Sequence, residues 1–237
     1  VSLDADDQTL LLGRGVFETL RTYDGVLFGL DAHLRRLQAS ARLVGVVCPD
    51  LDLLASELAA AASHIGAEAV VRVTLTHGGC RIVRANSLAE PPSGYRCATR
   101  LWEPVSWLPG EVKHTSRAQS VLAVESADVD EVIWTDAAGF LLEGTRSNLF
   151  AVIGGALCTP PLDGRLLAGV TRAALLEAAT RIGVPVHQAP IHVDADFAEL
   201  YLSSTLKELC PVTELNGTPA AGGGPVGAAV SAAMRRA

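Results

Sequence analysis

Short apolar runs separated by tight turns fill residues 131–159, and this pattern limits the folds that the chain can adopt. The runs occupy 131–135, 140–143, 148–152 and 156–159, with glycine in the turns at 136–139 and 154–155. Strands this short and this close in sequence pair with their neighbours through hairpins. The second half of the chain is therefore predicted to form an antiparallel or barrel-like sheet.

The first half of the chain shows a different, mostly helical pattern. Residues 31–45 begin with the capping residue Asp31, place apolar side chains on one stripe and end at Gly45. The same reasoning predicts a second helix over 50–65 and a strand over 70–76, and later in the chain helices over 116–127 and 170–182.

Two prolines and a glycine, Pro104, Pro109 and Gly110, stand in a stretch with a poor apolar period. Such composition is typical of exposed linkers between domains. With 237 residues, 49% of them hydrophobic, the chain can bury a sizeable core in one large domain or two small ones. We expect two: a smaller N-terminal domain over 1–103, a linker over 104–110, and a larger C-terminal domain over 111–237.

Charge and cysteine content exclude several functional classes. The chain has 19 lysine and arginine residues against 26 aspartate and glutamate residues, a net charge of -7, and no basic run. Nucleic acid is therefore not an expected partner. The five cysteines show no paired or zinc-finger spacing, no leader pattern is visible, and no apolar run approaches the ~20 residues of a membrane span. We expect a cytoplasmic protein without a metal site or a membrane partner.

A lysine, an acid and a glycine-led helix start follow one another in the order that pyridoxal phosphate chemistry needs. Lys113 can form an imine, Glu143 can hold a pyridine nitrogen, and residues 166–172 can hold a phosphate at a helix start. Each alone has a simpler interpretation: a solvated lysine, a glutamate at a strand end, and an ordinary threonine cap. Together, in this order, they favour an enzyme.

Seven short motifs run in order over nearly the whole chain: 15–21, His33 with Arg36 and Leu37, Lys113 with His114 and Arg117, 143–150, 159–161, 167–172 and 203–205. The set resembles the class IV aminotransferase family, the fold type IV group of pyridoxal phosphate enzymes. That group includes branched-chain aminotransferases, D-amino acid aminotransferases and 4-amino-4-deoxychorismate lyases. The resemblance implies a two-domain α+β fold with a barrel-like second domain, the cofactor in the interdomain cleft, and a homodimer whose partner loops help to close the site.

The resemblance also implies which residues bind the cofactor. Lys113 would be the catalytic residue and form the Schiff base, and Glu143 would face the pyridine nitrogen. Arg36 would bind the cofactor phosphate through its planar guanidinium. Val170 and Thr171 would complete the phosphate site with backbone N–H groups and a hydroxyl at a helix start.

A second turn and two arginines are candidates for binding the substrate. By the resemblance, Ser204, Thr205 and Leu206 would supply donors to the phosphate and to the substrate carboxylate. Arg81 and Arg117 carry guanidinium groups suited to a carboxylate. The simpler interpretation is a polar loop, and for Arg81 a surface arginine.

Two reactions are compatible with these residues. Lys113 with His114 and Arg117 is similar to the lyase branch, Phe17 stands where D-amino acid aminotransferases carry a tyrosine, and Ala118 stands where the branched-chain group carries one. These residues favour a lyase that converts 4-amino-4-deoxychorismate to 4-aminobenzoate and pyruvate in folate precursor synthesis. The alternative is an aminotransferase that moves an amino group between a branched-chain or D-amino acid and a 2-oxo acid. A remote third possibility is a non-catalytic binding protein of the same fold.

Three features depart from the family pattern. Arg14, between Gly13 and Gly15, stands where relatives usually carry an aspartate, and residues 76–81 lack the usual Arg-Gly pair. The family's opening strand is also missing before the first residue. We therefore expect the substrate pocket to differ locally from that of relatives.

Overall fold

The computed structural model describes residues 2–90 and 92–236, which form two compact units. Unit 1 holds the chain up to Glu90 and the later segment Glu111–Arg117, and unit 2 holds the rest. This division differs from the predicted boundary at Pro104, because the strand just before that proline pairs with strands of unit 2. The segment that carries Lys113 returns to unit 1.

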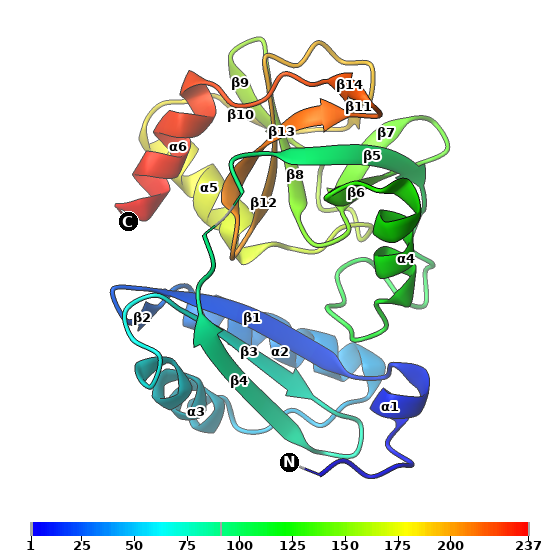
Figure 1. Cartoon of the computed structure of the whole chain (residues 1–237), viewed down its shortest axis with the longest axis vertical. Helices are drawn as coiled ribbons and strands as arrows, with labels where there is room; N and C mark the ends of the chain where they lie inside the picture. The colour runs from blue at the N-terminus through cyan, green and yellow to red at the C-terminus, as the bar shows by residue number, and fades with distance from the viewer. Residues whose placement is uncertain (1, 91, 237) are drawn as a thin grey trace. The chain divides into compact units, whose positions relative to one another are not determined.

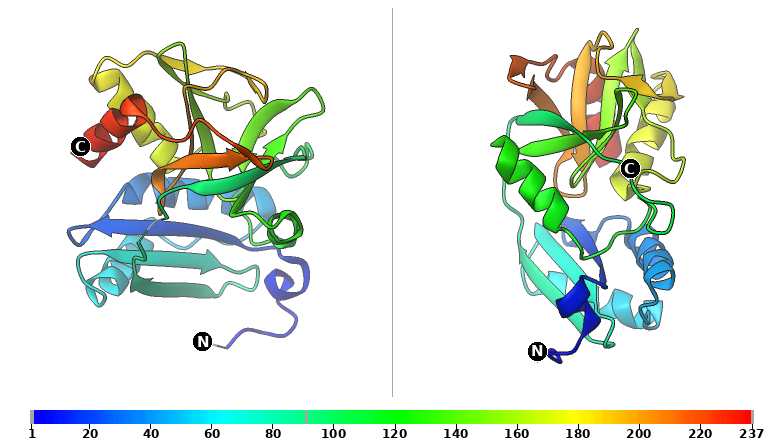
Figure 2. Two further views of the ribbon diagram at one scale, coloured as in Figure 1. Left: turned by 45° about the horizontal axis from the view of Figure 1, so that its top comes forward. Right: turned by 90° about the vertical axis from the view of Figure 1, so that its right-hand side faces the viewer.

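Unit 1 is a four-stranded sheet, in the order β2-β1-β3-β4, with two helices on one face (Figures 1 and 2). Its elements are α1 (Gln8–Leu12), β1 (Val16–Tyr23), β2 (Val26–Leu27), α2 (Leu30–Val44), α3 (Leu51–Ser63), β3 (Ala69–Leu75) and β4 (Arg81–Ser87). Alternate side chains of β1 and β3, such as Leu20 and Val71, pack against Leu37 of α2 and Leu58 of α3. The predicted helices and the strand at 70–76 are present.

Unit 2 contains a closed ring of six strands, in the order β5-β6-β7-β8-β12-β13 and back to β5 (Figure 1). Its elements are β5 (Tyr95–Leu101), α4 (Ala118–Ala127), β6 (Glu131–Thr135), β7 (Phe140–Gly144), β8 (Asn148–Ile153), β9 (Ala156–Thr159), α5 (Val170–Arg181), β10 (Val186–Gln188), β11 (Ile191–His192), β12 (Glu199–Ser204), β13 (Glu208–Leu215), β14 (Thr218–Pro219) and α6 (Pro225–Arg235). The predicted barrel-like sheet is confirmed.

Both faces of strand β8 are buried, which explains its continuous apolar run. Leu149 packs with Ile133 and Leu200 of neighbouring strands, whereas Phe150 packs with Leu175 of α5 in a second cluster that also includes α6. Successive side chains of a strand point to opposite faces, so β8 contributes side chains to two separate hydrophobic clusters. Within the described residues, no helix is long and apolar enough to cross a membrane.

Candidate active site

Lys113 lies in an extended segment that runs beside β1 in unit 1. Its backbone N–H donates to Ser40 Oγ at 3.1 Å, and its carbonyl accepts from the Phe17 N–H at 3.1 Å. The Lys113 ammonium lies 4.9 Å from the centroid of the Phe17 ring. The predicted imine-forming lysine is therefore held by its backbone from both sides, ahead of helix α4.

Glu18 is a fully buried carboxylate beside this segment, and two side chains of α2 bind it. Arg36 Nε donates to Glu18 Oε1 at 2.6 Å and Arg36 Nη2 to Oε2 at 2.8 Å, while His33 Nδ1 lies 2.8 Å from Oε2. Burial raises the pKa of Glu18, but the hydrogen bonds from His33 and Arg36 and the charges of Arg36 and Lys113 outweigh it and lower the pKa to about 2. Unit 1 thus places a buried anion next to the predicted lysine.

The pairing of Arg36 with Glu18 is a finding that the sequence analysis missed. His33, Arg36 and Ser40 share one face of α2 at helical spacing, so they meet Glu18 and the Lys113 segment together. The signal in the sequence is an acid at an inward-facing position of the strand, among buried apolar neighbours. Binding of the cofactor phosphate by Arg36 stays a prediction.

Arg72 on β3 is a second residue that the sequence analysis missed. Its Cζ lies 3.7 Å from the centroid of the Phe17 ring, and it faces Arg84 directly across the β3–β4 pair. Burial lowers the pKa of Arg72, and the charges of Arg117 and Arg84 lower it further. Within the part of the chain that the structure describes, no carboxylate is hydrogen-bonded to Arg72. Such a guanidinium is suited to an anion from outside the protein.

Arg81, a predicted carboxylate ligand, is bound to Glu57 of α3. Its Nε and Nη2 donate to the two Glu57 oxygens at 2.8 and 2.7 Å. The pair lines a surface cavity of about 480 Å³ together with Ala61 and Val83. This cavity is built on α3 and β4 and includes none of the residues around Lys113.

Glu143 lies on β7 in register with Asn148 on β8. Glu143 Oε2 accepts from the Asn148 side-chain amide and from the Leu167 N–H, both at 3.1 Å. The same amide group also donates to the Leu167 carbonyl at 2.9 Å. The structure therefore brings the predicted pyridine-binding acid to the segment that precedes helix α5, within unit 2.

Residue 169, just before helix α5, is a glycine, and the lack of a side chain lets Asn148 approach the start of the helix closely. A Cβ at Gly169 would lie 1.9 Å from Asn148 Oδ1. Thr171 is buried in the first turn after Val170, and its Oγ1 has no hydrogen-bond partner among the described residues. A buried hydroxyl without a partner is costly. Together with the N–H groups of the helix start, it fits an anionic ligand.

The second predicted turn leaves the strand that flanks Asn148. Ser203 of β12 is in register with Asn148, and its buried Oγ also lacks a partner within residues 2–90 and 92–236. Ser204 Oγ accepts from the Lys207 N–H at 3.3 Å and closes the turn that carries Thr205 and Leu206. Glu143, the start of α5 and this turn are therefore arranged around one asparagine of unit 2.

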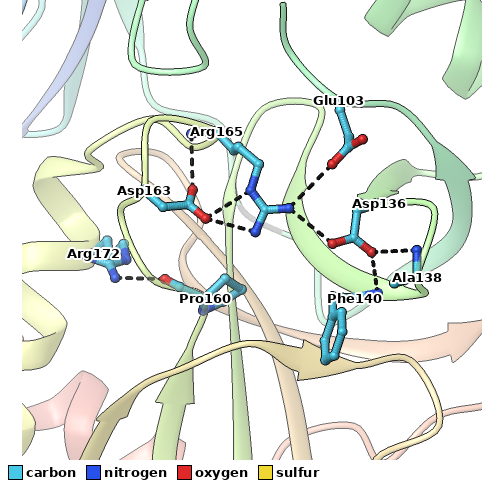
Figure 3. A network of polar contacts seen from close by, with 8 residues as sticks. All are labelled: Glu103, Asp136, Ala138, Phe140, Pro160, Asp163, Arg165 and Arg172. Atoms are coloured by element: carbon cyan, nitrogen blue, oxygen red, sulfur yellow. Dashed lines mark hydrogen bonds and ion pairs between the residues drawn. The ribbon is translucent and has the colours of Figure 1, made fainter. Parts of the chain in front are cut away.

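Ion pairs around Arg165 hold the loop that leads into α5 (Figure 3). Arg165 donates to Asp163 at 2.9 Å and to Asp136 at 3.0 Å, and Glu103 lies 3.5 Å away. Hydrogen bonding from Arg165 lowers the pKa of Asp163. Arg172, at the other end of the loop, donates to the Pro160 carbonyl at 3.0 Å. Two of the seven sequence motifs, 159–161 and 167–172, are therefore in direct contact.

Comparison with known proteins identifies the family. Residues 15–215 match the family model described as amino-transferase class IV. A Methanocaldococcus jannaschii protein provisionally named branched-chain-amino-acid aminotransferase is 33% identical, over 89% of this chain and 82% of its own. A D-alanine aminotransferase of Listeria innocua is 27% identical, over 95% of this chain and 87% of its own. The chain therefore belongs to the class IV aminotransferase family, and it is a pyridoxal phosphate-dependent enzyme.

Solved structures agree with the fold. A fold IV-transaminase of Curtobacterium pusillum superimposes with a TM-score of 0.88 at 27% identity, covering 100% of this chain and 90% of its own. The pyridoxal phosphate-bound form of a hypothetical aminotransferase from Mycobacterium tuberculosis gives 0.87 at 25% identity, covering 99% and 92%. A Legionella pneumophila protein provisionally named 4-amino-4-deoxychorismate lyase gives 0.87, covering 100% and 95%, but at 20% identity it shows the fold alone.

Proposed function

We propose that the protein is an aminotransferase that moves an amino group between an amino acid and a 2-oxo acid. The sequence analysis left two reactions open and placed the lyase first. The relatives at 33% and 27% identity are named as aminotransferases, whereas the likeness to a lyase structure extends to the fold only. These names and identities favour the aminotransferase reaction over the lyase reaction, with branched-chain and D-amino acids as candidate donors.

One observation carries the proposed chemistry: the chain contains only two lysines, Lys113 and Lys207. Burial in unit 2 lowers the pKa of Lys207 to about 8, but its amine is in direct contact with the Glu131 carboxylate and is not available to a ligand. Imine formation needs a neutral amine that can attack an aldehyde. We therefore assign the imine to Lys113, whose backbone is fixed beside β1.

The described residues fit pyridoxal phosphate, and each end of the cofactor has candidate ligands. When bound, the cofactor supplies an aldehyde for the substrate amine and a ring that withdraws electrons. We assign its phosphate to Arg36, to the backbone of Val170, and to the hydroxyls of Thr171 and Thr205. The buried hydroxyls of Thr171 and of Ser203, the residue two positions before Thr205, have no hydrogen-bond partner among the described residues and support this assignment. Glu143, held by two donors, would keep the pyridine nitrogen protonated.

The same residues would perform the proton transfers of transamination. Lys113 would remove the proton from the carbon that bears the substrate amine and deliver it to the neighbouring position, as a general acid and base. Arg72 and Arg117 would hold the substrate carboxylate, because no carboxylate of the described residues is hydrogen-bonded to Arg72, which lies against the same Phe17 ring as the lysine. Arg81, paired with Glu57, is a weaker candidate for that task.

Borohydride reduction of the loaded protein tests the lysine assignment. The treatment should fix the cofactor on Lys113, and mass spectrometry of the digested protein should find it there and not on Lys207. Lys113→Ala should lower turnover by more than ~10³-fold while the circular dichroism spectrum is unchanged. A label on Lys207, or turnover in the Lys113→Ala protein, would contradict the proposal.

A paired assay separates the two reactions. The protein is incubated with amino donors plus 2-oxo acids and, separately, with enzymatically generated 4-amino-4-deoxychorismate. We expect an aminated 2-oxo acid in the first reaction and no 4-aminobenzoate in the second. The reverse result would restore the lyase as the function.

We further propose that the enzyme acts as a homodimer, as the family resemblance implies. Helix α4 has no buried residue and exposes Val121 and Leu122, and Trp107 of the same unit is 83% exposed. Contiguous exposed apolar side chains such as those of Val121 and Leu122 are typical of interaction surfaces. Light scattering should give twice the chain mass of 24.7 kDa.

A further inference from the structure

Glu131 is a fully buried acid of unit 2 that has no role in the proposed reaction. It stands at the first position of β6, and its Oε1 accepts from the Arg146 N–H and from Ser147 Oγ, both at 2.7 Å. Its other oxygen, Oε2, is in contact with the Lys207 ammonium. A single carboxylate therefore holds two segments that are sixty residues apart in sequence.

Both of these segments carry residues that we assign to the cofactor. Arg146 and Ser147 form the loop between β7 and β8, and they lie directly between Glu143 and Asn148 in sequence. Lys207 closes the turn that carries Thr205, and its own N–H donates to Ser204 Oγ. Glu131 thus connects the loop beside the pyridine-binding acid with the turn assigned to the phosphate.

The packing around this pair leaves little freedom. The Lys207 side chain is 8% exposed, and its ammonium lies 4.3 Å from the centroid of the Tyr95 ring. A Cβ on Gly144 would lie 2.5 Å from Glu131 Oε1, so the loop wraps closely around the carboxylate. A buried ion pair is a poor source of stability compared with apolar packing, but it fixes the geometry of the groups that it joins.

We propose that Glu131 and Lys207 form a positioning pair for the cofactor. Lys207 holds the turn at 204–206 in place for the phosphate, and Glu131 holds the loop at 144–147 that orients Glu143. Neither residue touches the reacting atoms. This inference rests on the proposed function, because it takes the turn and Glu143 to be cofactor ligands.

Binding of pyridoxal phosphate and of pyridoxal, which lacks the phosphate, separates positioning from simple stability. Lys207→Met keeps the aliphatic stem and removes the charge. It should weaken the binding of pyridoxal phosphate to the full chain by about tenfold and that of pyridoxal by less than about twofold. Lys207→Arg, which can still reach Glu131, should restore most of the affinity for pyridoxal phosphate.

The control is a neighbouring ion pair of the same unit. Glu208 follows Lys207 directly in sequence, and its carboxylate accepts from Arg235 Nε at 2.5 Å. Arg235→Met removes this ion pair and leaves the contact between Lys207 and Glu131 in place. It should leave both affinities within about twofold of the wild type. An equal loss in Arg235→Met and Lys207→Met, or an unchanged preference for pyridoxal phosphate in Lys207→Met, would overturn the inference.

A second variant keeps the test decisive if Lys207→Met does not fold. Ser147→Ala removes one donor to Glu131 on the side of Glu143, so it should weaken pyridoxal phosphate and pyridoxal by the same factor, about threefold. Unchanged affinities in this variant would overturn the inference. Failure of the proposed function is recognised separately, because the paired assay of the wild-type chain reports which reaction occurs, whereas these affinities are the same for either reaction.

Discussion

Among single residues, Arg36 is the cation that pairs with the buried carboxylate of Glu18 in unit 1. Its guanidinium is 12% exposed and binds the fully buried Glu18 through two nitrogens. Arg36→Ala would leave a buried carboxylate without its main partner, so we expect a loss of about 3–5 kcal/mol in the free energy of unfolding. Urea unfolding at pH 7 measures this loss.

Arg35 provides the matched control for that experiment. It is the adjacent residue on α2, and it is exposed. Arg35→Ala should change the free energy of unfolding by less than about 0.5 kcal/mol. Similar losses in the two variants would show that the ion pair with Glu18 contributes nothing.

The lowered pKa of Glu18 also makes a pH-dependent contribution to stability. The pKa falls from 4.5 to about 2 on folding, so this contribution is fully present above pH 4.5 and is lost as the pH falls towards 2. Between pH 5 and pH 3 the wild type should lose about 2 kcal/mol that Glu18→Gln does not lose. Urea unfolding at the two pH values measures it; parallel acid curves would contradict the assignment.

Among the structural elements, the start of helix α5 depends on one glycine. A side chain at Gly169 would collide with Asn148 Oδ1. The Nδ2 group of the same Asn148 side chain donates to Glu143, so the collision would displace a hydrogen-bond donor of Glu143. Gly169→Ala should therefore weaken pyridoxal phosphate binding by at least about tenfold, as fluorescence titration can measure. In Gly223→Ala the nearest contact is 3.0 Å, to Pro211 Cγ, and affinity within about twofold of the wild type is expected there.

Local signals in the sequence predicted most helices correctly. The apolar stripe and the terminal glycine placed a helix at 31–45, and the structure has it at Leu30–Val44. The predicted cap was wrong: Asp31 lies in the first turn, and the N-cap is Gly29. Composition alone is a poorer guide at the end of β4, which continues to Ser87. Asn86 and Ser87 are residues typical of loops, yet pairing with β3 keeps them in the sheet. Tertiary pairing overrides composition at such edges.

The candidate site was predictable only in part. The resemblance named Lys113, Glu143 and the start of α5, but no local pattern shows that Glu143 would bind Leu167. Glu18, Arg72 and Glu131 were missed because their roles depend on partners far away in sequence. Burial of charge is a property of the packed molecule, and a reading of neighbouring residues does not reveal it.

For the whole molecule, cofactor binding should couple the stabilities of both units. We assign ligands in unit 1 and in unit 2, so pyridoxal phosphate at a hundredfold excess over its Kd should add about 2.7 kcal/mol. All three tryptophans, Trp102, Trp107 and Trp134, lie in unit 2, so their fluorescence reports that unit. Thiol reactivity of Cys48 and Cys80 reports unit 1. We expect both midpoints to rise; a shift in one alone would assign the ligand to a single unit.

The barrel of unit 2 is closed where β7 meets β8, and among the described residues these strands are in register at one position, Glu143 with Asn148. The other junctions of the ring extend over two to five positions. The ring of strands is therefore most weakly paired at this junction, and one of the two side chains there, Glu143, is the one that we assign to the cofactor's ring. In cofactor-free protein, the backbone amides at the junction of β7 and β8 should exchange with deuterium first. Bound cofactor should slow that exchange, so the ligand would help to hold the barrel closed.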